Sequence, residues 1–531
     1  MLTLATIFGA SISSCHTVSV LWAGKLALFL SAVSIFGFFS FYLCAFSLIL
    51  NYDTSQLTSR KAKLSGAQIA AIFIILVLCW MPYVIIWALG SLNEDMAWQI
   101  DRFTGQQALS SHHPLVSTAV YGSLFTIGEA ISHDGGGILF SVIIQTLVFA
   151  ASITYLFKCL VDLKAQKPFL IGSLLFFCLV PVFGSYCQDD VKDTLFTSVF
   201  CAYFVQLIKC ALAFSKQKEE ASMRMVLLSK NVILLFVFAV AVSMLRNNGP
   251  YVVILSLPLL AHFLPARIKK KGAALLCALA LIGPVLNIVI IEGTGAVKGN
   301  SGEMLSIPFQ QTARSVVEHD PDISDSEKQV IDSVLRYSDI AQRYQWNISD
   351  QVKYAYDGEK PLLPYFQTWL QMGIKYPVSY LDAVLDLTYG YWFVEMAPSY
   401  PHPFATYRQT DECMSLDVHY YFEEELRSSF TSCLSTMKAL PGFGLLTQTA
   451  LYCVMLVIEC TFLLSKKRAR WALLLFPHLV LLLTCLAGPV NGYIRYVLPL
   501  IATAPLTLWF SIFASSCSLG QKTVSQSVLS R

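Results

Sequence analysis

The chain has 531 residues, of which 55% are hydrophobic and 13% are charged, and its formal net charge is +3. Soluble proteins carry about 25% charged residues, so this composition, with a mean hydropathy of +0.59, excludes an ordinary soluble globular protein. The small net charge gives no indication of nucleic-acid binding. Apolar runs close to the length needed to cross a bilayer recur along most of the chain. These features predict an all-α polytopic membrane protein.

We predict about twelve transmembrane helices from these apolar runs. They are expected at residues 3–23, 26–50, 67–90, 137–157, 168–186, 193–213, 229–245, 250–264, 272–292, 442–464, 470–487 and 492–514. Most of the 15 cysteines lie within these runs, where a thiol behaves as a small apolar side chain.

The apolar segment 114–130 is a further candidate span. The positive-inside rule decides its placement, because five basic clusters fall on one side of the membrane only if this segment does not cross. We therefore predict a juxtamembrane helix on the outer surface, an outer loop at 91–136, and both chain termini in the cytoplasm. The basic clusters are Arg60-Lys61-Lys63, Lys158-Lys164-Lys167, Lys216-Lys218-Arg224, Arg267-Lys269-Lys270-Lys271 and Lys466-Lys467-Arg468-Arg470.

The largest polar segment, residues 293–441, lies outside by the same parity, and its acidic residues outnumber its basic ones. Helical patterns such as "DSEKQVIDSVLRYSDIAQRY" predict a mostly helical extracytoplasmic domain. Cys413 and Cys433 are a candidate disulfide, because the outer side permits oxidation. Two free thiols are the alternative.

Polar residues concentrate near the outer ends of several spans that are far apart in sequence. Ionisable groups at membrane depth are costly and usually mark a functional path or site. The candidates are Asp95, Gln99, Asp101, His112 and His113 in the first outer loop; Asp189, Asp190, Lys192 and Asp193 in "YCQDDVKD"; Arg246, Asn247 and Asn248 in "RNNG"; and Asn491, Arg495 and Tyr496 in "GPVNGYIRY".

These residue types suit a lipid-phosphate substrate. Arg and Lys can hold a phosphate through charge-assisted hydrogen bonds, and a nearby carboxylate can deprotonate an acceptor hydroxyl. Asp189 and Asp190 are candidate ligands of a divalent cation such as Mg²⁺ or Mn²⁺. Simpler roles exist for each type: a boundary Arg or Lys anchors lipid headgroups, an aspartate caps a helix, and "HHP" begins one.

A span followed by an outer loop with an aspartate, a glutamine and "HHP" resembles the GT-C superfamily, the integral-membrane glycosyltransferases that use polyprenyl-phosphate-linked sugars. Asp95 in "NEDMAWQI" occupies the place of that superfamily's catalytic aspartate, with Asp101 as second choice. "VKDTLF" at 191–196 resembles the lysine-aspartate pair of some bacterial members. "LRNNGPY", "LSIPFQQTAR", "ISDQVK" and "RYVLPL" also look like segments of an uncharacterised bacterial subfamily.

The resemblance covers most of residues 67 to 505 and implies a GT-C-like fold in four parts. These are two additional N-terminal helices with a basic loop (1–66), a transmembrane module with the catalytic outer loop (67–292), the extracytoplasmic domain (293–441) and the C-terminal helices with a cytoplasmic tail (442–531).

The resemblance also implies a reaction at the outer face of the plasma membrane, between a polyprenyl-phosphate-linked sugar donor and a glycan or lipid acceptor. Asp95 is then the catalytic base, and a single displacement inverts the anomeric carbon. The expected phosphate partners are Lys192, Arg246 and Arg495. Further substrate contacts are expected from Gln99, Asp101, His113, Asp193, Asn247 and Tyr496.

Two other functions fit the same residues. In a transporter or flippase of lipid-linked glycans the arginines would line a pathway, although such proteins often show internal repeats and charges at the membrane midplane. In a polysaccharide polymerase or ligase a residue of the large outer loop, such as His319, His402 or His419, would matter more than Asp95.

Overall fold

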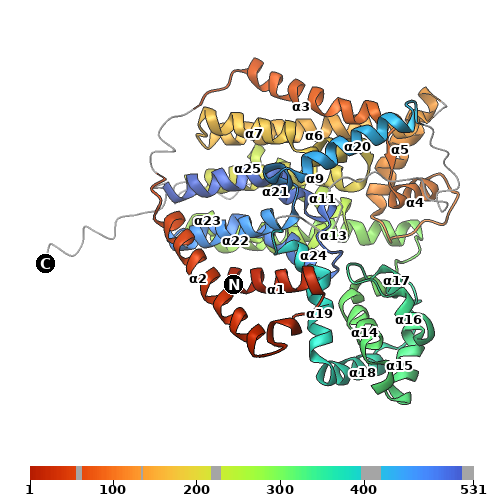
Figure 1. Ribbon diagram of the computed structural model, residues 1–531. Coiled ribbons are helices and arrows are strands. Elements are labelled where there is room, and N and C mark those ends of the chain that lie inside the picture. Colours follow the sequence, from red (N-terminus) through yellow and green to blue (C-terminus); the bar gives the residue numbers. More distant parts are fainter. Residues whose placement is uncertain (55–61, 133–134, 217–228, 396–419, 517–531) are drawn as a thin grey trace.

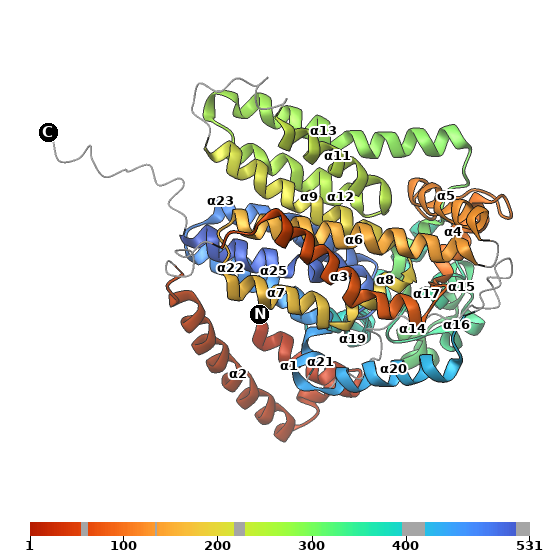
Figure 2. The same cartoon turned by 90° about the horizontal axis from the view of Figure 1, so that it is seen from above.

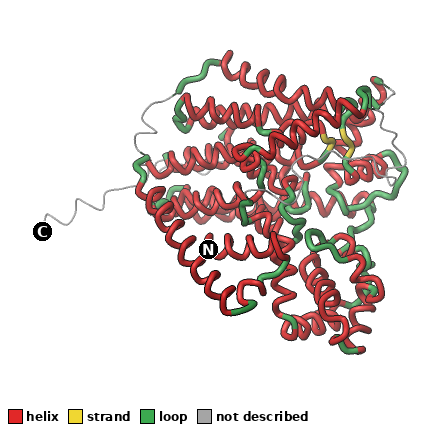
Figure 3. Tube along the Cα trace, viewed as in Figure 1, coloured by secondary structure: helices red, strands yellow, loops and turns green. Residues whose placement is uncertain are grey.

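The computed structural model describes residues 1–54, 62–132, 135–216, 229–395 and 420–516. The protein is almost entirely helical (Figures 1 and 3), with two strands of two residues each among the described residues. The prediction of an all-α multi-pass membrane protein is confirmed. Cys413, His402 and His419 lie outside the described residues, so the disulfide and two of the ligase histidines stay untested predictions.

Seven helices in the described part of the chain are long and apolar enough to cross a membrane, or eight if one bent pair forms a single span. The bent pair, α7 (Lys167–Leu179) and α8 (Pro181–Gln188), turns by 48° at its break. Proline begins α8 and ends the preceding hydrogen-bond ladder. The seven are α2 (Lys25–Asn51), α3 (Gly66–Ile86), α6 (Gly136–Asp162), α9 (Lys192–Ser215), α13 (Ala266–Thr294), the segment Ala469–Ala487 with α23 (Ala469–Ala472), η7 (Leu473–Leu475) and α24 (Phe476–Ala487), and α25 (Ile494–Ser516).

Eight of the about twelve predicted spans thus correspond to helices of spanning length among the described residues, with the bent pair counted as one. The other four predicted spans are apolar helices of at most 17 residues. A helix of that length rises roughly 26 Å, which is less than the hydrocarbon thickness of about 30 Å. The shorter segments are α1 (Leu2–Cys15), α11 (Lys230–Leu245), α12 (Gly249–Ser256) continued by η3 (Leu257–Phe263), and α22 (Thr449–Ser465).

The bundle is built around α9 and α25, which are buried along most of their length and contact each other. Large aromatic residues fill the space around them, among them Phe196, Phe200, Phe204 and Phe510. In contrast, α2 has no buried residue and lies at the edge of the bundle (Figure 2). An apolar helix exposed in this way is consistent with contact to lipid.

Segments that carry described residues of the basic clusters meet at one end of the bundle. The main-chain amide of Ala62 donates to Ala165 O at 3.2 Å, and Lys466 Nζ donates to Tyr52 O at 3.3 Å. Arg470 reaches Ser215 Oγ at 3.4 Å. The ends of α2, α6, α9 and α22 therefore meet here, and we call this the basic end.

The juxtamembrane helices lie at the opposite end, which we call the site end. Figures 1 and 2 place α4 (Glu94–Phe103) and α5 (Leu115–Ile131) together there. Because α3 leaves the basic end and α6 returns to it, the segment between them has both its ends at the site end. The prediction that 114–130 does not cross the bundle is confirmed by this arrangement.

Residues 301–391 form a set of helices beside the site end (Figure 1). They share a hydrophobic cluster that includes Phe309, Ile331 and Tyr365. They do not form a freestanding domain, because the main-chain amide of Asn491 donates to Asn347 O at 2.9 Å and joins them to the bundle. The helices are η4 (Ser301–Leu305), α14 (Ser306–His319), η5 (Asp320–Asp322), α15 (Asp325–Leu335), α16 (Tyr337–Arg343), α17 (Asp350–Lys353), α18 (Leu362–Lys375), α19 (Pro377–Thr388) and η6 (Tyr389–Tyr391).

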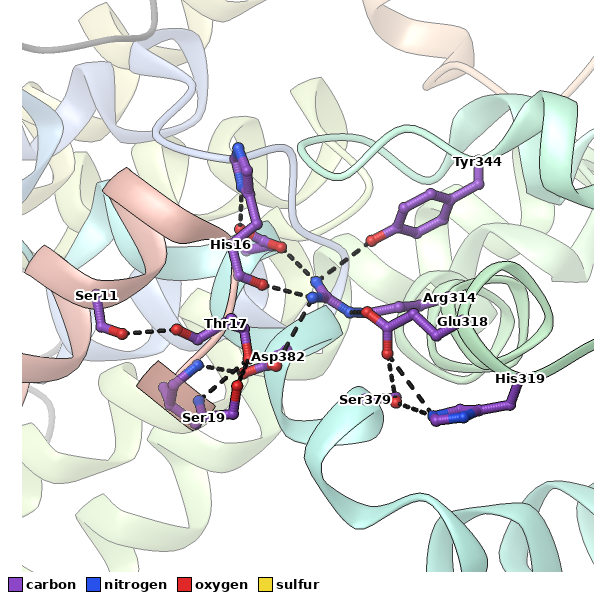
Figure 4. A network of polar contacts seen from close by, with 12 residues as sticks. Ser11, His16, Thr17, Ser19, Arg314, Glu318, His319, Tyr344, Ser379 and Asp382 are labelled. Carbon is purple, nitrogen blue, oxygen red and sulfur yellow. Dashed lines mark hydrogen bonds and ion pairs between the residues drawn. The ribbon is translucent and has the colours of Figure 1, made fainter. Parts of the chain in front are cut away.

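A buried arginine joins this set of helices to the N-terminal segment (Figure 4). Arg314 donates to Glu318 Oε1 at 2.8 Å, to Asp386 Oδ2 at 2.5 Å and to the carbonyl of His16 at 2.5 Å. His16 precedes η1 (Ser19–Trp22) and reaches the same Asp386 at 2.9 Å. His319, a candidate in the ligase alternative, shares a hydrogen bond of 2.9 Å between its Nε2 and Ser379 Oγ. This contact gives His319 a structural role.

The chain returns to the bundle through α20 (Glu424–Ala439) and α21 (Pro441–Leu446). Phe430 of α20 packs edge-on against Tyr83 and Trp87 at the end of α3. Cys433, on the same helix, is exposed.

Candidate functional site

Two very short strands bring the first and second predicted outer loops together. β1 (Ser91–Leu92) pairs in parallel with β2 (Asp189–Asp190). Gln188 Oε1 strengthens this junction by accepting from Ser91 N at 3.1 Å and from Ser91 Oγ at 2.7 Å. Because parallel strands run in the same direction, the residues that follow each strand emerge side by side.

A helix begins directly after each strand. Asn93 is the N-cap of α4, and its Oδ1 accepts from the amide of Asp95 at 2.9 Å. Lys192 and Asp193 occupy the first turn of α9. The strand pair thus places the first turns of α4 and α9 next to each other, with Asp95 facing Lys192.

Asp95 is held by two cations. Lys192 Nζ donates to Asp95 Oδ2 at 2.9 Å, and Arg495 Nη2 donates to the same oxygen. Arg495 lies at the start of α25, in the "GPVNGYIRY" segment. The Asp95 side chain is 26% exposed, while that of Lys192 is 9% exposed. Three residues predicted from separate segments therefore meet in one partly open cluster.

A second carboxylate joins the two arginines. Arg495 Nε donates to Asp193 Oδ2 at 2.6 Å, and Arg246 Nη1 lies 3.3 Å from Asp193 Oδ1. The Arg246 guanidinium also lies over the ring of Tyr496, 5.1 Å from its centroid. Asp193 is 1% exposed, and the field at the start of a helix favours its negative charge.

These five groups do not balance in charge. Lys192, Arg246 and Arg495 carry three positive charges against the two carboxylates of Asp95 and Asp193. A partly buried excess of positive charge favours an anionic ligand, and guanidinium groups match phosphate geometry.

The paired cations control the protonation of Asp95. Burial by itself raises the pKa of the Asp95 carboxyl, but Arg495 and Lys192 oppose this and hold the pKa well below its usual range. At neutral pH the group is therefore a carboxylate. While both cations are paired to it, it is a weak base.

His113 extends the cluster as a neutral imidazole. Its Nδ1 lies 3.3 Å from Lys192 Nζ, and burial together with the Lys192 charge lowers the pKa of His113 to about 2. A neutral imidazole whose Nδ1 accepts a hydrogen bond from Lys192 carries its proton on Nε2. That Nε2 is buried and has no hydrogen-bond partner among the described residues, so it is a donor available to a ligand.

We expect His113 to make the folded protein sensitive to mild acid. Its pKa is about 2 in the folded state against 6.5 normally, so below pH 6.5 the unfolded chain takes up a proton that the native state refuses. Stability should fall with decreasing pH by at most about 1.4 kcal/mol per unit from this group. Replacing His113 by Gln should flatten the decline of the unfolding midpoint between pH 7 and pH 5 in detergent micelles.

The exposed His262 provides the matched control for this measurement. His262→Gln should retain the pH dependence of the unmodified protein. An unchanged slope in His113→Gln would show that the histidine is already protonated, or accessible to water, in the folded state.

Two predicted contacts in the first loop take structural positions. Gln99 is fully buried; its Nε2 donates to Asp95 O at 3.1 Å and its Oε1 accepts from Ser117 Oγ at 3.0 Å. It therefore joins α4 to α5 and does not point into the cluster. The Asp101 carboxylate accepts from Gln107 at 3.4 Å, at the far end of α4. Six helical residues rotate its side chain away from the face that carries Asp95.

The proposed cation ligands, Asp189 and Asp190, receive no support from the geometry. Both are fully buried, their carboxylate oxygens have no hydrogen-bond partner among the described residues, and burial raises the pKa of both. Successive strand residues point to opposite faces. No group of three or more His, Cys, Asp or Glu side chains in the described part of the chain is placed to hold a metal ion.

Asn247 and Tyr496 lie at the edge of the cluster. Asn247 is exposed, and its Nδ2 donates to His112 O at 2.8 Å, which joins the "RNNG" turn to the first loop. Tyr496 stacks under Arg246 and holds that guanidinium toward Asp193. Of the predicted residues, the structure thus brings together Asp95, His113, Lys192, Asp193, Arg246, Arg495 and Tyr496.

Sequence reasoning missed three residues that build the site. Asn93 caps α4 and accepts from Arg495 Nη1 at 3.4 Å. Gln145, deep in α6, donates to Asp189 O at 2.6 Å and to Cys187 O at 3.0 Å, which fixes the second loop. Tyr121 donates to Val191 O at 2.9 Å. The sequence signal for Asn93 is an asparagine followed by two acids at a helix start, whereas a polar residue inside an apolar run is the only signal for Gln145.

Comparison with known proteins assigns the chain to a family. Residues 104–524, about four fifths of the chain, match the model described as "Family of unknown function (DUF6020)", and the protein belongs to that family. The match includes Lys192, Arg246 and Arg495 and begins after Asp95. Neither a curated protein nor a solved structure matches the chain significantly.

Proposed function

We propose that this member of the DUF6020 family is a membrane glycosyltransferase of GT-C type, which transfers a sugar from a polyprenyl-phosphate donor to a glycan or lipid acceptor. The observation that carries the proposal is the meeting of Asp95 with Lys192 and Arg495 at the site end of the helical bundle. A carboxylate beside an excess of cations is what a reaction with a phosphate leaving group and a hydroxyl nucleophile requires.

The reaction takes place on the extracytoplasmic side in this proposal. The described residues of the basic clusters lie at the basic end, opposite to the site, and basic loops stay in the cytoplasm. The helices of residues 301–391 then lie outside, beside the site. This orientation gives the site access to lipid-linked sugars of the outer leaflet.

The donor phosphate replaces part of the internal pairing. Arg246 and Arg495 both stay paired with Asp193. The phosphate accepts hydrogen bonds from those N–H groups of Lys192, Arg246 and Arg495 that Asp193 does not use. The neutral His113 offers its Nε2 proton to the same ligand. As the phosphate draws Lys192 and Arg495 from Asp95, the carboxylate becomes more basic.

The chemical step is a single displacement. Asp95 accepts the proton of the acceptor hydroxyl, the acceptor oxygen forms a bond to the anomeric carbon, and the bond from that carbon to the phosphate oxygen breaks. The polyprenyl phosphate leaves with the electron pair of the broken bond, and the configuration at the anomeric carbon is inverted. Neighbouring cations stabilise the phosphate as its negative charge increases.

The test is an assay of the purified protein in liposomes with a panel of labelled polyprenyl-phosphate sugars as donors and alkyl glycosides as acceptors, in which release of the lipid phosphate is followed. Arg246→Gln should raise the KM for the donor about tenfold or more, because a charge-assisted bond to phosphate is lost. Asp193 remains paired with Arg495 in this variant, so the fold should be retained.

Arg336→Gln is the matched control, since Arg336 is 58% exposed and belongs to the helices beside the site. It should leave KM unchanged. Movement of intact donor across the bilayer without release of lipid phosphate would contradict the proposal and indicate a flippase.

A further inference from the structure

A cavity of about 520 Å³ opens beside the candidate site. It forms where the loop before α5, the end of α13 and the segment leading into η4 meet. The main chain holds these segments together: Ser111 N donates to Val297 O at 2.8 Å, and Val297 N donates to Leu109 O at 2.9 Å. The cavity is therefore part of the folded framework.

The wall of the cavity reaches the charged cluster through two histidines. His112 lines the cavity, and its ring lies 4.6 Å from that of His113, centroid to centroid. His113 in turn contacts Lys192 at 3.3 Å, and Lys192 contacts Asp95. Asn247, also in the wall, directly follows Arg246. Two side chains, His112 and His113, thus lie between a ligand in the cavity and Lys192.

The polar lining suits hydroxyl groups better than phosphate. Asn247, Ser111 and Ser301 offer amide and hydroxyl groups, which both donate and accept. Lys298, the lysine of the lining, lies 3.6 Å from Glu292 of the same lining, which offsets its charge. Glu303, the second acid of the lining, is paired with Lys353 at 2.7 Å. The cavity therefore has no cationic excess of the kind found around Asp193.

The other part of the lining is apolar. Ile288 and Ile291 belong to the outer turns of α13, a candidate membrane span, and Met304 lies opposite in η4. Ile288 is 60% exposed and Met304 is 73% exposed. A ligand with a hydroxylated headgroup can place it between the polar groups while its apolar chain follows α13 into the bilayer.

We infer that this cavity binds the acceptor, and that the acceptor is a sugar-bearing lipid with an uncharged, hydroxylated headgroup. The role of this ligand as acceptor rests on the proposed function, whereas its chemical class follows from the residues that line the cavity. Charge separates the two substrates: the donor phosphate goes to the arginines, and the neutral sugar goes to the cavity. The acceptor hydroxyl then enters past His113 toward Asp95.

The experiment uses an alkyl glucoside with a photoreactive diazirine in its chain, added to the full-length protein in nanodiscs, with cross-links located by mass spectrometry. We expect labelling within residues 288–304 that excess octyl glucoside suppresses. Met304→Trp should lower this labelling about tenfold by filling the cavity. Ile131→Trp, at a position 71% exposed on α5 and outside the cavity lining, is the matched control and should not change it.

A phosphocholine lipid with the same diazirine chain is the second probe. Equal labelling of residues 288–304 by both probes, or labelling that octyl glucoside does not suppress, would overturn the inference and leave an ordinary lipid contact. Suppressible glucoside labelling with no release of lipid phosphate from any donor would uphold the cavity and refute the proposed transfer. Release of lipid phosphate that Met304→Trp leaves unchanged would refute the acceptor role alone.

Discussion

Asp95→Asn is expected to lower turnover by about 10² to 10⁴-fold, because the amide keeps the shape of the carboxylate but cannot accept the proton of the acceptor hydroxyl. The KM for the donor should not rise, since Lys192 and Arg495 are released from the group they pair with. The measurement is the initial rate of lipid phosphate release at varied donor concentration in liposomes.

This combination of a lower kcat with an unchanged or lower KM distinguishes a base from a structural ion pair. If Asp95 served only to hold the two cations in place, its loss would disorder them and weaken donor binding as well. Glu94→Gln is the matched control, because Glu94 is the neighbouring acid in the first turn of α4. It should retain turnover, and full turnover in Asp95→Asn would remove Asp95 from the mechanism.

Asp193→Asn is expected to destabilise the protein by about 3 to 5 kcal/mol, because it leaves buried cations without their counter-charge. Asp193 is 1% exposed and is the shared partner of Arg246 and Arg495. The free energy of unfolding in mixed micelles, followed by near-ultraviolet circular dichroism, measures this loss.

Asp162→Asn provides the comparison for Asp193→Asn. The Asp162 side chain is 56% exposed and its contact with Lys209 is 3.6 Å long, so its removal should cost less than about 1 kcal/mol. Combining Asp193→Asn with Arg246→Gln should cost less than the sum of the two single changes, because the arginine no longer lacks a partner. Equal effects of Asp193→Asn and Asp162→Asn would contradict the buried pairing.

Sequence alone predicted the helical class and the position of most helices. The membrane side of each loop stays a prediction. Long apolar runs can satisfy their backbone groups in a bilayer only as helices, and basic clusters mark one side. The lengths of the helices were less predictable. The "RNNG" turn limits α11 and α12 to fewer residues than a full span, and the proline that begins α8 bends another predicted span. Seven or eight helices among the described residues reach the length and apolarity of a span.

The candidate site shows the same division. Residue type and position at span ends singled out Asp95, Lys192, Asp193, Arg246 and Arg495, because charge at membrane depth is costly and informative. Residue type did not show that Gln99 faces α5 and that Gln145 fixes the second loop. Buried amides of this kind look the same in sequence whether they bind a ligand or a backbone carbonyl.

The sequence by itself thus determined which charged residues stand at the ends of the apolar segments, and it predicted the side of the membrane on which they lie. Only the tertiary structure decided which groups meet: Lys192 lies 97 residues from Asp95 in sequence, and Arg495 lies 302 residues from Asp193. Such contacts depend on the parallel pairing of β1 with β2 and on the packing of α25 against α9. No local pattern encodes them, because the free energy that forms them comes from burying surfaces distant in the chain.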